Sequence, residues 1–190
     1  ALESHRRASS AIRSGHFKEQ ITPITLNSKG RESVFDTDEH VRHDLQEGDL
    51  SELRTIFKKD GTVTPGNSSG INDGAAALVL MTAEKAQDLD AKPFATIRSY
   101  ALAGVDPAIM GIGPFPAMQM ALKRAGLSVE DLDVIESNEA FAAQACAVSD
   151  LLNLPSERVN PNGGAIALGH PLGATGAILM TKLIYELRRI

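Results

Sequence analysis

The feature that most constrains this chain is a glycine-rich segment, residues 160–177, which surrounds a single histidine, His170. Glycine costs backbone entropy in regular elements, so a high glycine density predicts sharp turns or a backbone that a ligand approaches closely. Pro171 disfavours the helical conformation at the residue before it. We therefore expect His170 to lie in a rigid loop that leads into a helix starting near Gly173.

The size and charge of the chain exclude several classes of protein. Its 190 residues are long enough for one sizeable core, or for a core with a smaller appendage. A formal net charge of -5 argues against nucleic acid as the main partner, because nucleic-acid binding needs a basic face. The longest apolar run, Ala75 to Met81, is too short to span a bilayer, and no export leader opens the chain. We expect a globular protein with no membrane partner.

Cys146 is the only cysteine, which excludes an internal disulfide framework and a multi-cysteine metal site. This usage fits a reducing compartment, and we expect a cytoplasmic protein. Cys146 falls in the middle of a predicted helix, away from the helix entrances that favour a thiolate, so we interpret it as a buried structural residue. The remaining histidines lack metal-ligand spacing and are interpreted as surface residues: His5, His16, His40 and His43. No metal is expected.

The hydrophobic pattern alternates between strand-like and helix-like segments. Strands are expected at residues 21–26, 75–81, 94–102 and 133–137. Helices are expected at residues 1–15, 50–57, 83–90, 116–125 and 141–152, and around an apolar stripe formed by Leu179, Leu183, Ile184 and Leu187. This alternation predicts a three-layer α/β unit. Both ends of the chain lie inside helical patterns, so we expect a fragment of a longer protein; a trimmed protein with frayed ends is the alternative.

Two further segments could carry a ligand. The loop at residues 62–74 is rich in small polar residues that suit an extended ligand such as a phosphopantetheine arm, although such loops are mostly turns. Asn138 and Glu139 follow the predicted strand 133–137, and ligands bind at the carboxyl ends of strands in α/β sheets. The alternative is that Asn138 caps the next helix while Glu139 complements its dipole.

Four ordered motifs together resemble the thiolase family, and in particular its acetyl-CoA C-acetyltransferase branch. They are Asn-Glu-Ala-Phe-Ala at 138–142, Gly-Gly-Ala-Ile-Ala-Leu-Gly-His-Pro at 163–171, the loop at 66–76 and Met-Gly-Ile-Gly-Pro at 110–114. The resemblance implies a thiolase-like three-layer α/β/α C-terminal domain at residues 71–190, truncated before its last strands. Residues 1–70 would then be part of the family's coenzyme A-binding loop domain.

The resemblance also implies roles for individual residues. His170 corresponds to the histidine that activates the nucleophilic cysteine and polarises the thioester oxygen, and Asn138 to the asparagine that holds a water in the same oxyanion hole. Coenzyme A is implied as a substrate, with no other cofactor, and the residues implied to contact it or its acyl group are Ser69, Arg42, Phe57, Met110 and Phe141.

The required chemistry fits these residue types. A free thiol with a pKa of ~8.5 is only a few per cent thiolate at neutral pH, so a neighbouring base such as His170 activates it. Negative charge then develops on the thioester oxygen, where a preorganised donor is worth on the order of 3 kcal/mol. The family is expected to form homo-oligomers and to act in reactions such as those of fatty acid metabolism.

The chain departs from the family pattern in one decisive way. Both family cysteines, the nucleophile and the acid-base residue, fall outside the positions present here, and Cys146 matches neither. We therefore expect the chain alone to be inactive. The alternative is a non-catalytic coenzyme A-binding or interaction module that a partner chain completes. A ketoacyl synthase is disfavoured because residues 138–142 read as thiolase.

Overall fold

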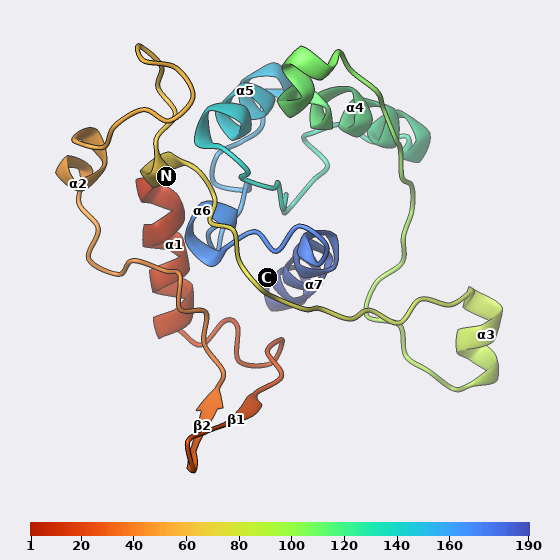
Figure 1. Ribbon diagram of the computed structural model, residues 1–190. Helices are drawn as coiled ribbons and strands as arrows, with labels where there is room; N and C mark the ends of the chain where they lie inside the picture. The colour runs from red at the N-terminus through yellow and green to blue at the C-terminus, as the bar shows by residue number, and fades with distance from the viewer.

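The chain is described here from a computed structural model that covers residues 1–190. Its α-helices are α1 (Leu2–Arg13), α2 (Glu47–Ser51), α3 (Ala83–Asp88), α4 (Pro114–Ala125), α5 (Ala142–Leu152), α6 (Ala165–Leu168) and α7 (Thr175–Arg189), with two 3-10 helices, η1 (Pro65–Asn67) and η2 (Pro107–Ile112). The two strands are β1 (Ile24–Ser28) and β2 (Arg31–Phe35). Helices α1, α6 and α7 occupy the centre, and α4 and α5 lie together on one side (Figure 1).

The central packing depends on small residues. Ala8 of α1 and Ala167 of α6 are fully buried and form a cluster with Val41. Gly163, just before α6, lies so close to α1 that a Cβ there would be 2.7 Å from the backbone oxygen of Ser4. Alanine and glycine let two backbones approach in this way, which brings the glycine-rich segment directly against the first helix.

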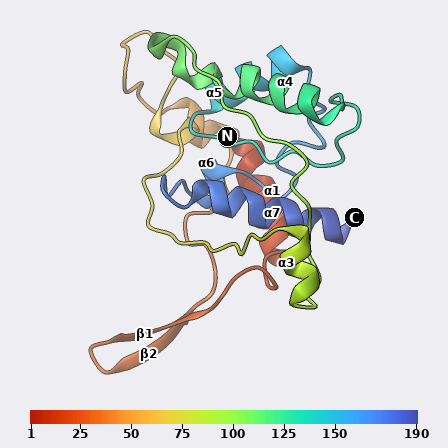
Figure 2. The same cartoon turned by 90° about the vertical axis from the view of Figure 1, so that its right-hand side faces the viewer.

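The strands β1 and β2 form an antiparallel hairpin with Ile24 opposite Phe35 and Ser28 opposite Arg31. Lys29 and Gly30 connect them, both with positive φ, as a two-residue hairpin turn requires. The hairpin projects from the body of the molecule, and all of its residues are exposed (Figure 2). The expected extended segment at residues 21–26 is confirmed in its second half.

Several helix predictions are confirmed by local signals in the structure. Helix α1 covers most of residues 1–15, and Gly15 follows it with φ of 75°. Helix α4 has proline in its first turn and ends at Gly126, which takes the left-handed conformation with φ of 70°. Asn153 ends α5 in the same conformation. Helix α3 lies within the expected range, residues 83–90.

The strands expected at residues 75–81, 94–102 and 133–137 are not paired into a sheet. The first two run as extended chain on either side of α3 (Figure 1). The third makes a single parallel bridge, Ile135 to Val159. A strand needs a neighbour to hydrogen-bond, and no neighbouring strand lies beside these segments within the 190 residues. The α/β pattern is therefore present in the order of elements, but the layers of a sheet are not assembled here.

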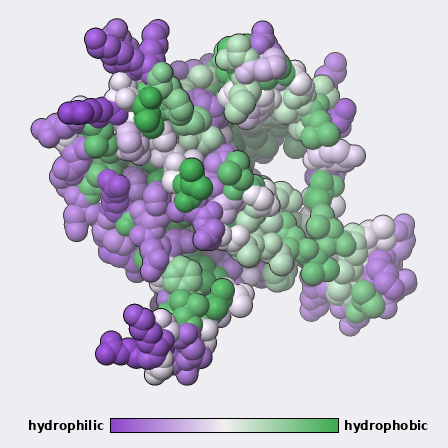
Figure 3. Space-filling view, in the orientation of Figure 1, coloured by the Kyte–Doolittle hydropathy of each residue, from purple (hydrophilic) through white to green (hydrophobic).

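Exposed apolar side chains mark these unpaired segments. Val79 is 86% exposed and Leu102 is 85% exposed. Figure 3 shows apolar surface along the segments that lead to α3. Exposed apolar surface of this kind is typical of a face that contacts another segment or another protein.

Two other predictions of helical structure need correction. The predicted helix at residues 50–57 is wrong, because α2 ends at Ser51 and Phe57 is 73% exposed. The last helix exists, but its buried side chains are polar, Thr175, Lys182 and Glu186, whereas Leu187 of the expected apolar stripe is exposed. Helix α6 was not predicted, since four residues between glycines carry too little periodicity.

Candidate active site

His170 lies in the loop between α6 and α7, as its glycine-rich context predicts. Gly169 has φ of 98°, and a Cβ there would be 2.8 Å from the side-chain amide of Asn72. The backbone N–H of His170 donates to Asn72 Oδ1 over 3.1 Å. Asn72 belongs to the polar loop 62–74, so this loop holds the backbone of His170 in place.

The imidazole is held in one tautomer by its neighbours. Nδ1 lies 2.7 Å from Thr175 Oγ1, and the Thr175 hydroxyl donates its only proton to the carbonyl of Pro171 over 3.0 Å. Nδ1 must therefore carry the proton of the His170–Thr175 hydrogen bond. Nε2 is then unprotonated and can accept a hydrogen bond or a proton, the form of imidazole that acts as a general base.

Asn138 lies next to this lone pair. Its Nδ2 is 3.3 Å from His170 Nε2 and donates to it. Its Oδ1 is buried and has no hydrogen-bond partner. A buried orphan acceptor indicates a place for a donor such as a water or a ligand group. The helix-capping interpretation of Asn138 is wrong, because the N-cap of α5 is Phe141.

Glu139 has a structural position beneath the glycine-rich segment. Its carboxylate accepts from Ser4 Oγ over 2.6 Å, from Asn160 Nδ2 over 3.1 Å and from the backbone N–H of Ile166 over 3.3 Å. A Cβ on Gly164 would lie 2.2 Å from its Cδ. Glu139 thus complements the start of α6 rather than α5, and it joins α1 to the loop that carries His170.

The polar loop 62–74, called the Ser69 loop below, contacts the segment that contains Asn138. Ser69 donates its backbone N–H to the carbonyl of Ala140 over 3.0 Å, and Ser68 forms an antiparallel bridge with Phe141. The ring of Phe57 contacts the ring of Phe141 edge-on, with centroids 5.9 Å apart. The structure therefore brings Ser69, Phe57 and Phe141 together beside the motif.

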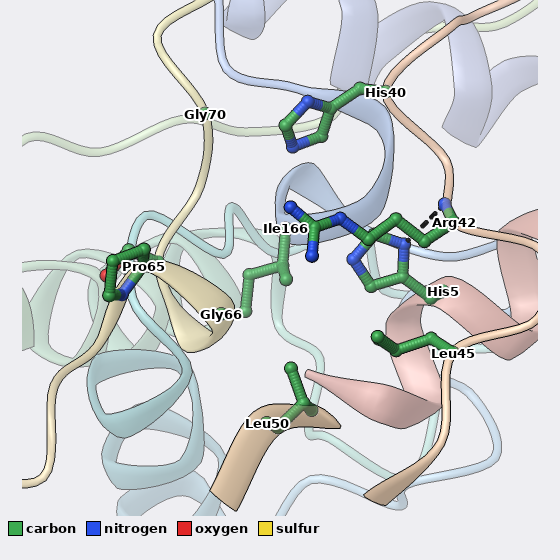
Figure 4. Close-up of a pocket in the computed structure, with 10 residues that line it drawn as sticks. His5, His40, Arg42, Leu45, Leu50, Pro65, Gly66, Gly70 and Ile166 are labelled. Atoms are coloured by element: carbon green, nitrogen blue, oxygen red, sulfur yellow. Dashed lines mark hydrogen bonds between the residues drawn. The ribbon is translucent and has the colours of Figure 1, made fainter. Parts of the chain in front are cut away.

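Met110 and Arg42 are placed differently. Met110 lies in η2 and its side chain is 75% exposed. Arg42 extends into a pocket with His5 and His40, which Figure 4 shows beside its guanidinium. Gly70, in the Ser69 loop, closes this pocket, since a Cβ there would be 2.7 Å from His40 Cε1.

The surface interpretation of His5 is wrong. Its side chain is 4% exposed, and its Nδ1 accepts from the backbone N–H of Arg42 over 3.1 Å. Burial lowers the pKa of His5 from 6.5 to about 4, and the neighbouring His40 and Arg42 side chains add to this effect. The folded protein therefore holds a neutral imidazole at this position.

This buried imidazole predicts a pH dependence of stability. As the pH falls from 6.5 toward 4, unfolded chains take up a proton at His5 that the folded state excludes, so the free energy of unfolding decreases over this window. We expect His5→Gln to reduce that loss when urea midpoints are compared at pH 7 and pH 5. An equal acid sensitivity in both proteins would contradict the assignment.

Cys146 is exposed on α5, so its interpretation as a buried residue is wrong. No hydrogen bond joins its thiol to His170 or Asn138. The structure also shows no group of three or more His, Cys, Asp or Glu side chains arranged to hold a metal ion. None of the helices combines the length and apolar composition needed to cross a membrane.

Sequence reasoning missed the residues that support the site. They are Asn72, Thr175, Ser4 and Lys182. The position of Thr175, five residues after His170 at a helix start, was the only local signal among them. The other three lie far from their partners in the sequence or on a helix face that reads as surface.

Comparison with known proteins assigns both parts of the chain. Residues 1–84 match the family model "Thiolase, N-terminal domain", and residues 91–190 match "Thiolase, C-terminal domain". The chain is 58% identical to the beta-ketothiolase BktB of Cupriavidus necator, with all of this chain and 48% of BktB covered. It is 52% identical to the acetyl-CoA acetyltransferase of Chromobacterium violaceum, with 100% and 48% covered.

Solved structures agree with this result. The Bacillus anthracis acetyl-CoA acetyltransferase is similar with a TM-score of 0.96 and 52% identity, over 99% of this chain and 48% of that chain. Human mitochondrial 3-ketoacyl-CoA thiolase in complex with CoA gives a TM-score of 0.90 and 43% identity, over 99% and 47%. The chain spans about half the length of the relatives it matches. Its fold matches that of about half of each of these structures, which confirms the α/β fold class. The chain belongs to the thiolase family.

Proposed function

We propose that the full-length polypeptide, meaning this chain extended to the length of its relatives, transfers acyl groups between coenzyme A thioesters. The reaction is that of an acetyl-CoA C-acetyltransferase, run as Claisen condensation or thiolysis through an acyl-cysteine. The observation that carries the proposal is the unprotonated Nε2 of His170, whose ring is held by Thr175 at Nδ1 and contacted by Asn138 at Nε2. Relatives named acetyl-CoA acetyltransferase support the choice of substrate.

In this proposal His170 takes the proton from the nucleophilic cysteine. After proton transfer its imidazolium donates from Nε2 toward the thioester oxygen, on which negative charge develops. Asn138 orients the neutral imidazole through Nδ2, a bond that is released when Nε2 takes the proton, and its unpartnered Oδ1 holds a water. Both residues are fixed before substrate arrives, which is what electrostatic stabilisation of a transition state requires.

We further propose that the coenzyme A thioester binds along the Ser69 loop. The contacts of that loop with Ala140 and Phe141 support this path, because they place it beside the segment that carries Asn138. Phe57 and Phe141 present adjoining rings to the pantetheine and acyl portions, with Met110 beyond them. Arg42 contacts the nucleotide end. Residues 1–70 form part of the loop domain, and residues 71–190 the C-terminal domain.

The cysteines of the reaction belong to the part of the polypeptide outside these 190 residues. Cys146 has no contact with the proposed base and is not assigned a catalytic role. We propose that the complete protein is a homo-oligomer, on the family resemblance alone. Because Cys146 makes no hydrogen bond to His170, the alternative function that we propose for residues 1–190 by themselves is that of a coenzyme A-binding module which a partner completes.

Kinetics separate these functions. We expect the full-length polypeptide to cleave acetoacetyl-CoA in the presence of coenzyme A, measured by loss of the enolate absorbance. Residues 1–190 alone should give no turnover, because the nucleophile is absent. Full-length protein that binds coenzyme A by calorimetry but shows no thiolysis would overturn the enzymatic proposal and favour the module.

A further inference from the structure

The helix that follows His170 buries a polar face. Its buried residues are Thr175, Lys182 and Glu186, at 8%, 5% and 4% exposure. They are spaced seven and then four positions apart, so they lie on one side of α7. Helices normally turn an apolar stripe toward the core, and lysine is almost never fully buried unless it is paired. A polar face turned toward the interior therefore needs a specific explanation.

Each of the three residues forms a hydrogen bond with a residue between Asn162 and His170. Thr175 bonds the His170 ring, Lys182 Nζ donates to the carbonyl of Gly163 over 2.6 Å, and Glu186 accepts from Asn162 Nδ2 over 2.7 Å. One helix face therefore holds both ends of the segment from Asn162 to His170. A straight helix is rigid over this length, so it fixes the distance between the two ends.

Lys182 also neutralises a second buried group. Its Nζ lies 2.7 Å from Glu136 Oε2, and the two side chains are 5% and 1% exposed. A buried ion pair is seldom more stabilising than two apolar side chains of similar size. The pair is thus poorly explained by stability alone, whereas the bond to Gly163 gives the ammonium a geometric role.

The peptide bond between Gly163 and Gly164 is held from both sides. Lys182 binds its carbonyl, and Ser4 Oγ accepts from its N–H over 3.0 Å. This peptide immediately precedes α6, and α6 ends at Leu168, which is followed by Gly169 and His170. A shift of the carbonyl would therefore move α6 and the backbone of His170 with it.

We propose that Lys182 is a positioning residue, which sets the place of the His170 imidazole by anchoring the Gly163 carbonyl to α7. The expected effect on kcat rests on the proposed function, whereas the anchoring of the Gly163 carbonyl by Lys182 does not depend on it. A misplacement of about 1 Å at a catalytic group can cost about 100-fold in rate, so a remote anchor has a measurable effect.

The first test separates positioning from charge neutralisation. In the full-length polypeptide, Lys182→Met should lower the Tm because it leaves Glu136 unpaired. It should lower kcat because the Gly163 carbonyl loses its anchor. Lys182→Met/Glu136→Leu removes both charges and should recover most of the Tm, while kcat stays about tenfold below the parent with KM for acetoacetyl-CoA little changed. Lys182→Arg, which can still donate to both oxygens, should restore kcat. A double variant with the parent's kcat would overturn the proposal.

The second test is independent of activity. Hydrogen exchange measured by mass spectrometry should show faster exchange in peptides that span residues 163–170 in Lys182→Met and in the double variant. Lys123→Met, on an exposed lysine of α4, is the matched control and should leave that exchange unchanged. Unchanged exchange in the double variant would overturn the anchor even if the enzyme is active. A parent protein without thiolysis would instead refute the proposed function and leave this readout valid.

Discussion

His170→Gln is expected to lower kcat/KM for acetoacetyl-CoA thiolysis by about 10²–10⁴-fold in the full-length polypeptide. Glutamine can keep a hydrogen bond to Thr175 or to Asn138, but it has no nitrogen lone pair that accepts a proton at neutral pH. The loss should therefore be in catalysis and not in folding. Steady-state kinetics with circular dichroism and a thermal melt would measure both.

The matched control for this change is His43→Gln. His43 is exposed, and its Nδ1 hydrogen-bonds Ser9 Oγ, a contact that the glutamine amide can replace. We expect a rate within about twofold of the parent, in line with the small effects of surface substitutions. A His170→Gln enzyme with the same rate as the control would refute the assignment of His170 as the base.

Gly163→Ala is expected to lower the free energy of unfolding by about 3 kcal/mol, the sum of a left-handed alanine and an overpacked contact. Gly163 has φ of 81°, and its Cβ would meet Ala8 N at 2.8 Å and Ser4 O at 2.7 Å. These are backbone atoms of α1, which cannot turn aside as a flexible side chain can. Urea denaturation of the full-length polypeptide would give the value.

Gly48→Ala makes the same chemical change without either penalty. Gly48 lies in α2 with no atom within 4 Å of its Cβ position and no positive φ. Alanine is the better helix former by about 1 kcal/mol, so stability should be unchanged or slightly higher. Equal destabilisation by both substitutions would show that the close approach of Gly163 to α1 is absent in solution.

The predictions that held depend on short stretches of sequence. Gly126 closes α4 because a residue without Cβ adopts the left-handed conformation easily, and this signal is complete within a few residues. The failed strand predictions depend on pairing, which no single segment contains. Residues 75–81 have the composition of a buried strand, yet they remain unpaired where no neighbour is present.

The site shows the same division. His170 and Asn138 stand in motifs that can be recognised from the residues themselves, and they contact each other in the structure. Asn72 looked like any other turn residue, because its bond to His170 joins positions 98 residues apart. The sequence predicts an exposed His5 and a buried Cys146, and the structure shows the reverse. Burial depends on which distant segments cover a residue, and no local pattern contains that information.

The bond from Gly164 to Ser4 Oγ spans 160 positions of the chain, and that from Ser4 to Glu139 spans 135. Contacts of such sequence separation form slowly, because closing a long loop costs entropy before the contact repays it. During synthesis α1 is made before both of these partners of Ser4, whereas its other partners, such as Val41 and Arg42, follow it closely in the chain. The contacts of Ser4 with Gly164 and Glu139, which support the loop of His170, are thus among the last parts of this region to form as the protein folds.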